Sequence, residues 1–449
     1  MMKFGCRLVF VVLIILALGL LRASSGATSS TSVIDKTREL LKVAEELRGL
    51  EFEGELDVEL VDREGMNRVI QRELDEQLTE EMDRKFSALY AFLGLIEPGS
   101  SLREQYQAMA EEQVAGLYDP GDKKFYVMNI DMGSALESMF GDLGILGDFI
   151  GGFIEGLGFD LSDTIIVHEL THAIDDQHFD IQGKIEYLQE MNSDDAQLAY
   201  QSLLEGSATK VMNDFQVRSV GLDPSLIGEL NMVEPAMLEG LMDFGPFLER
   251  VIITPYLYGD AFVRHVLTEE GQDGLNIAFR DPPESMEQIL HPERYTQRDH
   301  PSVVHEPDML RTLPDWSREA VDTLGELLIS LIVEINLGDE ELGKQVGEGW
   351  DGDRITSWRG PEGELAICWV TVWDDEKEAK EFYNAAVRIL ELKYPGKGEK
   401  EWDVAFFKDR GSAGAVEIKG NVVVIVDGVP PSKVEECIDD AWDTPIMIR

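Results

Sequence analysis

The segment from Thr164 to His178 reads TIIVHELTHAIDDQH, and its histidines His168 and His172 stand four positions apart. The segment is helical in pattern, and residues four apart share one face of an α-helix, so both imidazoles can point at one metal ion. Glu169 lies one step round the helix and can act as a base. The pattern leaves the third protein ligand unnamed, and the position of that ligand decides which fold the chain adopts.

Neutral imidazole is a common ligand of Zn²⁺, and three protein ligands with one water make a catalytic zinc site rather than a structural one. Zinc lowers the pKa of its bound water to about 7, which provides a nucleophile at neutral pH. We therefore predict that Zn²⁺ is the cofactor, that His168 and His172 bind it, and that Glu169 is the general base.

The stretch resembles the active-site helix of zinc metallopeptidases that carry the motif HExxH. In the metzincin branch the motif extends to HExxHxxGxxH, and His178 falls on its last position, but Asp175 stands where the glycine belongs. That glycine lets the chain turn sharply out of the helix. If the helix instead continues through Asp175, His178 lies about 600°, or some 240° round the axis, from His172 and points away from the metal.

A second candidate ligand lies in the segment DAQLAYQSLLEGSATKVMNDF, residues 195–215, where Glu205 borders an apolar stripe. A carboxylate at the edge of a buried face is unfavourable unless it is paired or bound to a metal. Gly206 and the small residues after it permit close helix approach. The segment resembles the glutamate helix of gluzincins, the thermolysin-like branch, so we favour Glu205 over His178 as the third ligand. The stripe consists of Leu204, Ala208, Val211 and Phe215.

The resemblance to gluzincins also implies a His or Tyr that stabilises the tetrahedral oxyanion. The segment PPESMEQILHPERY contains His291, which we expect to have this role, and Tyr295 as the alternative. The layout of residues 40–300, with GLYDPGDKKFYV before the motif and EQILHPERY after the glutamate helix, resembles a group of secreted prokaryotic gluzincins. The implied activity is the hydrolysis of peptide bonds in a polypeptide substrate.

Residues 1–27 have the features of a signal peptide: a basic start, an apolar run from Leu8 to Leu21, and small residues before the expected cleavage site. This run of 14 residues would span about 21 Å as a helix, less than the roughly 30 Å of a bilayer core, so we predict secretion. A membrane anchor is expected only if the segment stays uncleaved.

The formal net charge of −48 argues against nucleic acid and anionic membranes as partners.

We expect an α+β fold in which a mostly helical, zincin-type catalytic domain with a small sheet occupies residues 28–345. A smaller α+β module is expected over residues 346–449.

Strand patterns flank a turn at residues 119–122, which predicts a hairpin that either holds the extended substrate or is purely structural. The glycine-rich apolar segment 133–158 is interpreted either as a lid over the site or as packed short helices.

Residues 317–337 are expected to form one apolar helix that ends the catalytic domain. The module that follows contains no histidine, and its Cys368 and Cys437 could form a disulfide or remain buried thiols. Two alternatives to a gluzincin stay open. One is a metzincin-type zinc peptidase that uses His178, and the other is a non-catalytic zinc-containing binding protein, against which the intact Glu169 argues.

Overall fold

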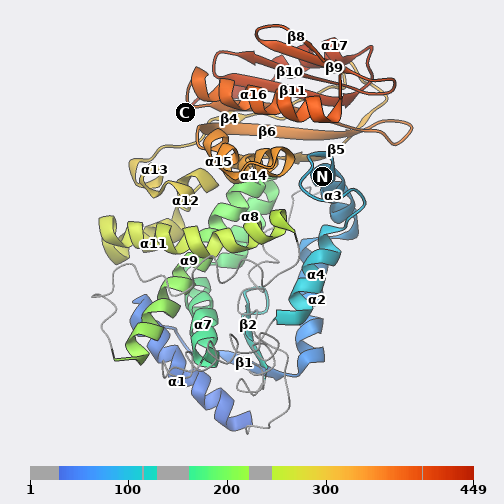
Figure 1. Ribbon diagram of the computed structural model, residues 1–449. Coiled ribbons are helices and arrows are strands. Elements are labelled where there is room, and N and C mark those ends of the chain that lie inside the picture. The colour runs from blue at the N-terminus through green and yellow to red at the C-terminus, as the bar shows by residue number, and fades with distance from the viewer. Residues whose placement is uncertain (1–29, 114–115, 129–160, 222–244, 397) are drawn as a thin grey trace, which may run out of the picture.

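The computed structural model describes residues 30–113, 116–128, 161–221, 245–396 and 398–449. The predicted signal peptide over residues 1–27 and the glycine-rich segment 133–158 lie outside the described residues. The fold is α+β, as predicted, with a small three-stranded sheet towards one end, helices in the middle and a seven-stranded sheet at the other end (Figure 1). Among the described helices, none has the length and apolar character needed to cross a membrane.

The first part of the chain forms the small sheet and the helices next to it. Strand β1 (Asp57–Val61) pairs in parallel with β3 (Lys124–Met128), and β3 pairs antiparallel with β2 (Gly116–Asp119). The last pair is the predicted hairpin, and β2 is an edge strand of the sheet because the strand order is β1-β3-β2. The helices of this part are α1 (Ser30–Arg48), α2 (Arg63–Gln77), α3 (Glu80–Phe92) and α4 (Leu102–Gln113).

The middle of the molecule is helical, and α9 is central to it because it packs against α7 and against α11. Helix α11 contains a break at Gly271, where φ is 68° and the helix kinks. The helices of this part are α7 (Leu161–Phe179), α8 (Ile181–Met191), α9 (Asp194–Ser219), α11 (Pro246–Arg280), α12 (Met286–Leu290) and α13 (Pro292–Gln297).

The seven-stranded sheet has the strand order β5-β6-β7-β11-β10-β9-β8, and neighbouring strands are antiparallel. Its two faces are covered differently: Trp369 on β7 packs on Phe382 of α16, whereas Cys368 belongs to the cluster on the other face, with α17. Cys368 and Cys437 are both buried free thiols. The strands are β5 (Ser317–Asp322), β6 (Trp350–Arg359), β7 (Leu365–Trp373), β8 (Gly398–Lys400), β9 (Val404–Lys408), β10 (Ala413–Lys419) and β11 (Val422–Val429), and a separate ribbon joins β4 (Val303–Val304) to β12 (Ile446–Met447). The helices are α14 (Gly325–Leu337), α15 (Glu340–Gly347), α16 (Glu376–Lys393) and α17 (Val434–Trp442).

The prediction of one helix over residues 317–337 is wrong in its first part. Ser317–Asp322 forms β5, which pairs with β6, and helix α14 begins only at Gly325, where φ is 73°. The pairing partner lies more than thirty residues further along the chain, so a local apolar pattern could not reveal it. Because β5 precedes the expected domain boundary at residue 346, we use the name C-terminal domain for residues 317–449, the sheet with its helices.

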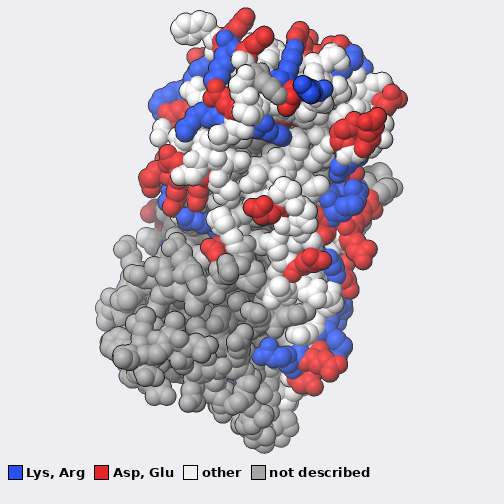
Figure 2. All heavy atoms as spheres, turned by 45° about the vertical axis from the view of Figure 1, so that its right-hand side comes forward, with Lys and Arg blue, Asp and Glu red and all other residues white. Residues whose placement is uncertain are grey.

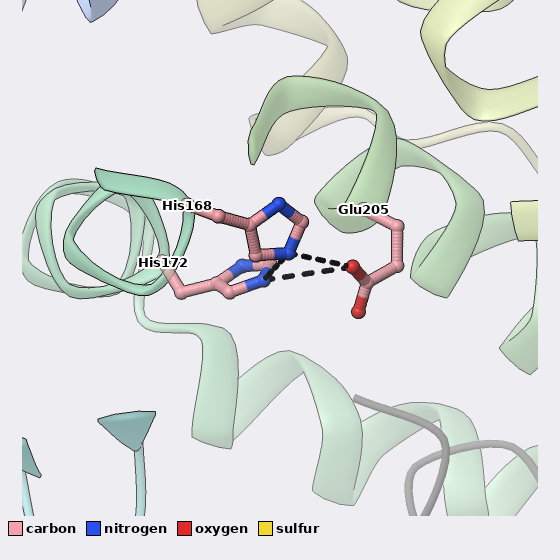
Figure 3. A group of neighbouring side chains, drawn as sticks. All are labelled: His168, His172 and Glu205. Carbon is pink, nitrogen blue, oxygen red and sulfur yellow. Dashed lines mark hydrogen bonds and ion pairs between the residues drawn. The ribbon is translucent and has the colours of Figure 1, made fainter. Parts of the chain in front are cut away.

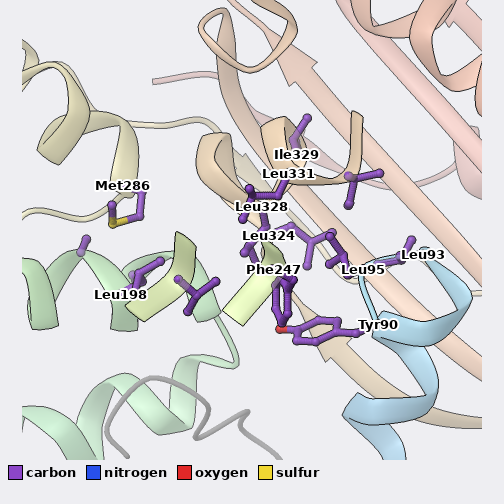
Figure 4. Packing of buried hydrophobic residues seen from close by; sticks show 14 of the residues in the cluster. Tyr90, Leu93, Leu95, Leu198, Phe247, Met286, Leu324, Leu328, Ile329 and Leu331 are labelled. Carbon is purple, nitrogen blue, oxygen red and sulfur yellow. The ribbon is translucent and has the colours of Figure 1, made fainter. Parts of the chain in front are cut away.

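The helical middle and the C-terminal domain share one hydrophobic core. Figure 4 shows Tyr90 of α3 and Phe247 of α11 beside Leu324 and Leu328 of the C-terminal domain, and the rings of Tyr90 and Phe247 meet edge to face, 5.4 Å apart. Apolar surface buried between two parts stabilises their relative placement. The C-terminal domain is therefore built into the molecule rather than attached by a linker.

The acidic residues do not gather in one place on the face of the molecule shown in Figure 2. On the face shown in Figure 2, Asp and Glu are interspersed with Lys and Arg around an area of uncharged residues. Several acids of the described residues are paired with basic side chains, and Glu319 for example accepts from Arg359 at 2.7 Å. The net charge of −48 thus forms no single acidic block on this face.

Candidate metal centre

Helix α7 carries His168, Glu169 and His172, and all three side chains are buried. The helix forms as the sequence predicts, and its apolar residues pack into the cluster shared with α1 and the small sheet. A helix covered on several sides leaves its polar residues without solvent, and buried polar groups need partners. The partners of these three side chains come from α9 and β2, which are separate in sequence from α7.

His168, His172 and Glu205 converge on one point, the two histidines from α7 and the glutamate from α9 (Figure 3). The Nε2 atoms of the histidines are 3.2 Å apart, and Glu205 Oε2 lies 3.0 Å from His168 Nε2 and 3.7 Å from His172 Nε2. Ligands about 2.0–2.1 Å from a tetrahedral zinc ion lie about 3.3 Å from one another. The triangle therefore has the size that three ligands of such an ion require.

The pKa values of the three side chains reflect the negative charge of Glu205. Burial alone would lower the pKa of His172, but Glu205 beside it raises that pKa to about 9. Burial alone would raise the pKa of Glu205, yet the two histidines bring it below its usual range, whereas burial lowers the pKa of His168. Glu205 Oε1 is buried without a hydrogen-bond partner among the described residues. The pocket thus holds an anionic carboxylate with unused acceptor capacity beside a neutral His168 and a protonated His172, whose proton a metal ion would displace.

Glu169 lies next to this triangle and faces the hairpin. Its Oε2 accepts a hydrogen bond from the backbone N–H of Tyr118 in β2 at 3.0 Å. Burial raises the pKa of Glu169 to about 7, although His172 and this hydrogen bond act in the opposite direction. A carboxyl group that titrates near neutral pH is suited to accept and return a proton.

Helix α7 continues through Asp175, whose side chain has partners in two other helices. The side chain is fully buried, and its two oxygens accept from Arg48 Nε of α1 at 2.7 Å and from Ser207 Oγ of α9 at 2.8 Å. Helix α7 runs on to Phe179, so His178 is carried round the axis away from His172. His178 is exposed, and its Nε2 lies 2.8 Å from the carbonyl oxygen of Glu51. The structure therefore brings Glu205, and not His178, to the two histidines.

Glu205 is positioned by a close crossing of α9 and α11. A Cβ atom on Gly206 would lie 2.1 Å from the carbonyl oxygen of Gly259, and one on Gly259 would lie 2.0 Å from that of Ser202. The two backbones are therefore in direct contact, as the small residues after Glu205 suggested. The same helix α11 places the ring of Tyr256 parallel to His168, with 6.0 Å between ring centroids.

The structure does not bring His291 to this site. His291 Nε2 lies 3.0 Å from Glu326 Oε1 of α14, and this hydrogen bond raises the pKa of His291. Glu326 follows Gly325, which contacts Asp195 at the start of α9. Ten helical residues, or about 15 Å, separate Asp195 from Glu205. The pair with Glu326 joins the helical middle to the C-terminal domain, and it argues against the predicted role of His291 in stabilising an oxyanion.

Tyr295, the alternative to His291, is also structural. Its hydroxyl donates to the carbonyl oxygen of Asp281 at 2.8 Å, and its ring packs edge to face on Phe262.

Three residues next to the site were not predicted individually from the sequence: Tyr118, Tyr256 and Arg48. Tyr118 lies in the predicted hairpin, whereas Tyr256 and Arg48 belong to elements far from residue 168 in the chain, and no local pattern indicated them.

Comparison with known proteins covers only the C-terminal part of the chain. A family model described as "Domain of unknown function (DUF8575)" matches residues 311–438. No curated protein and no solved structure matches the chain. The matched region is less than half of the chain and contains none of the residues of the candidate metal centre. The C-terminal domain is thus similar to a family without an assigned function.

Proposed function

We propose that this protein is a zinc-dependent peptidase of gluzincin type in which His168, His172 and Glu205 hold the metal. The observation that carries the proposal is the triangle of ligand atoms, with edges of 3.0, 3.2 and 3.7 Å. Its donors, two imidazoles and a carboxylate, are those of catalytic zinc sites. The placement of His178 on the surface favours the gluzincin over the metzincin ligand set.

Zinc bound there would supply a Lewis acid that polarises a carbonyl and makes water acidic. Glu169 would take the proton of the attacking water and pass it to the leaving amine, as a general base and then a general acid. The N–H of Tyr118 holds the carboxylate of Glu169 in place for both transfers. Tyr256, stacked on His168, would keep that imidazole from rotating.

The edge strand β2 is suited to bind the substrate. The N–H of Tyr118 points to Glu169 rather than into the ladder with β3, so the side of β2 that has no partner strand among the described residues faces the candidate site. An extended peptide can add to such an edge through main-chain hydrogen bonds, which recognise a polypeptide with little demand on its sequence. The expected substrate is therefore an extended segment of polypeptide. Secretion, predicted from residues 1–27, would bring the enzyme to extracellular proteins.

The test combines metal analysis with digestion of casein by the purified protein. Wild-type protein is expected to contain about one zinc per chain. Glu169→Gln is expected to keep that zinc, but its hydrolysis rate should fall at least about 100-fold because the proton acceptor is gone. Glu205→Ala should lose the metal, whereas the control His178→Ala should keep metal and activity. Full hydrolysis by Glu169→Gln, or loss of metal only in His178→Ala, would overturn the proposal.

A further inference from the structure

The start of α9, the helix that carries Glu205, is held by the C-terminal domain. The first N–H groups of a helix have no partner within the helix and need outside acceptors. The N–H of Asp194 donates to Asp322 Oδ1 at 2.9 Å, and that of Asp195 donates to the carbonyl oxygen of Thr323 at 3.2 Å. Only the next N–H is capped within α9 and its own N-cap, by Ser193 Oγ. Two of three caps thus come from the end of β5.

Other contacts, partly buried or exposed, hold the same helix end. Arg354 of β6 donates to the carbonyl oxygens of Asn192 at 2.8 Å and of Met191 at 3.2 Å, just before α9. Gly325 packs so closely on the carboxylate of Asp195 that a side chain there would collide with it. Asp322 and Asp194 are 0% and 2% exposed, so water cannot replace these hydrogen bonds. The helix end is therefore seated in a socket formed by the C-terminal domain.

The place of Glu205 along α9 makes this socket relevant to the metal centre. At Gly206 the helix crosses α11 backbone to backbone, and beside this crossing Ser207 donates to Asp175 of α7 at 2.8 Å, so α9 is held at this point as well as at its start. A rigid helix transmits a shift along its axis, or a rotation about it, over its whole length. The socket about 15 Å away therefore contributes to the axial position of Glu205, and the crossing determines its distance from α11.

We infer that the C-terminal domain helps to fix the axial position of the metal-ligand helix α9, with Asp322 as the positioning residue. This inference rests on the proposed function for its consequence at the metal, but the contacts themselves are independent of it. Asp322, Thr323 and Arg354 all lie within residues 311–438, the region that matches a domain family of unknown function. In this chain, the role of that domain is to support the metal centre.

The test measures Zn²⁺ affinity by competition with a chromophoric chelator in full-length variants, together with the visible spectrum of the Co²⁺-loaded protein. Asp322→Ala removes the acceptor, whereas Asp322→Asn keeps an oxygen at the same place. Asp375→Ala is the matched control, because Asp375 caps α16 within the C-terminal domain by accepting from Lys377 N and Glu378 N at 2.7 and 3.0 Å. Arg354→Gln replaces Asp322→Ala in the comparison if the latter does not fold.

Asp322→Ala is expected to weaken Zn²⁺ binding by about tenfold or more and to change the Co²⁺ spectrum, since outer residues that orient ligands have effects of about 10–100-fold. Asp322→Asn should restore both, and Asp375→Ala should lower the melting temperature without changing either. Unchanged affinity in Asp322→Ala, or equal loss in Asp375→Ala, would overturn the inference.

Failure of the proposed function has a different signature: the wild-type protein would then bind no Zn²⁺. Amide hydrogen exchange of the metal-free variants decides the inference in that case. Faster exchange at residues 202–207 in Asp322→Ala, but not in Asp375→Ala, would support the socket as the anchor of α9. Equal exchange in the two variants would refute it.

Discussion

Replacement of Gly259 by alanine is expected to push α9 away from α11 and to displace Glu205. The new Cβ would lie 2.0 Å from the carbonyl oxygen of Ser202, whereas tight contacts of this kind lie at 3.0–3.4 Å. The difference, 3.0–3.4 minus 2.0, requires the helices to separate by about 1.0–1.4 Å. Zinc–ligand distances tolerate deviations of only about 0.2 Å. A shift of this size therefore moves Glu205 out of ligand range.

The expected result for Gly259→Ala is a loss of Zn²⁺ affinity of at least about tenfold, with an overpacking cost of about 1–3 kcal/mol in the free energy of unfolding. Chelator competition gives the affinity, and urea denaturation in the presence of EDTA gives the stability. Gly343→Ala is the matched control, because its Cβ would lie 2.6 Å from the carbonyl oxygen of Ser330 between α14 and α15. It should lose stability but keep wild-type affinity.

Wild-type Zn²⁺ affinity in a folded Gly259→Ala protein would refute the reasoning. It would mean either that α11 yields instead of α9, or that Glu205 does not bind the metal. The Glu205→Ala variant separates these two explanations, because it loses the metal only in the first.

Two further predictions concern ion pairs outside the triangle of ligand atoms. His291→Gln is expected to flatten the pH dependence of the free energy of unfolding. Because the pKa of His291 is raised, its pair with Glu326 stabilises the protein fully below pH 6.5, the ordinary histidine value. This stabilisation is lost as the pH rises through the raised pKa. Melting temperatures at pH 6 and pH 8.5 measure this, and activity should persist at both. Arg48→Met leaves the carboxylate of Asp175 buried with Ser207 as its remaining partner, and should lower the free energy of unfolding by about 3–5 kcal/mol. Urea denaturation measures this loss, and a loss under about 1 kcal/mol would contradict the prediction.

Much of the candidate site was predictable because its signals are local. The helix that carries His168 and His172 is predicted by apolar periodicity and spacing, and the hairpin by a turn sequence between two strand patterns. Glu205 was predictable for a different reason: a carboxylate beside an apolar stripe needs a partner, and small residues beside it indicate a close crossing. The α+β module predicted over residues 346–449 contains the strands β6, β7 and β9 to β11 of the C-terminal sheet.

Only the tertiary structure decided which distant parts of the chain come into contact. Whether Asp175 ends or continues the helix depends on Arg48 of α1 and Ser207 of α9, which bury and neutralise its charge. His291 is a plausible catalytic residue by sequence, and its pair with Glu326 places it elsewhere. The strand β5 and the socket of α9 likewise depend on partners in separate elements. The sequence by itself determined which side chains could bind a metal, because spacing along one helix is local. Packing determined which of them meet, because burial forces each polar group to find a partner wherever the fold provides one.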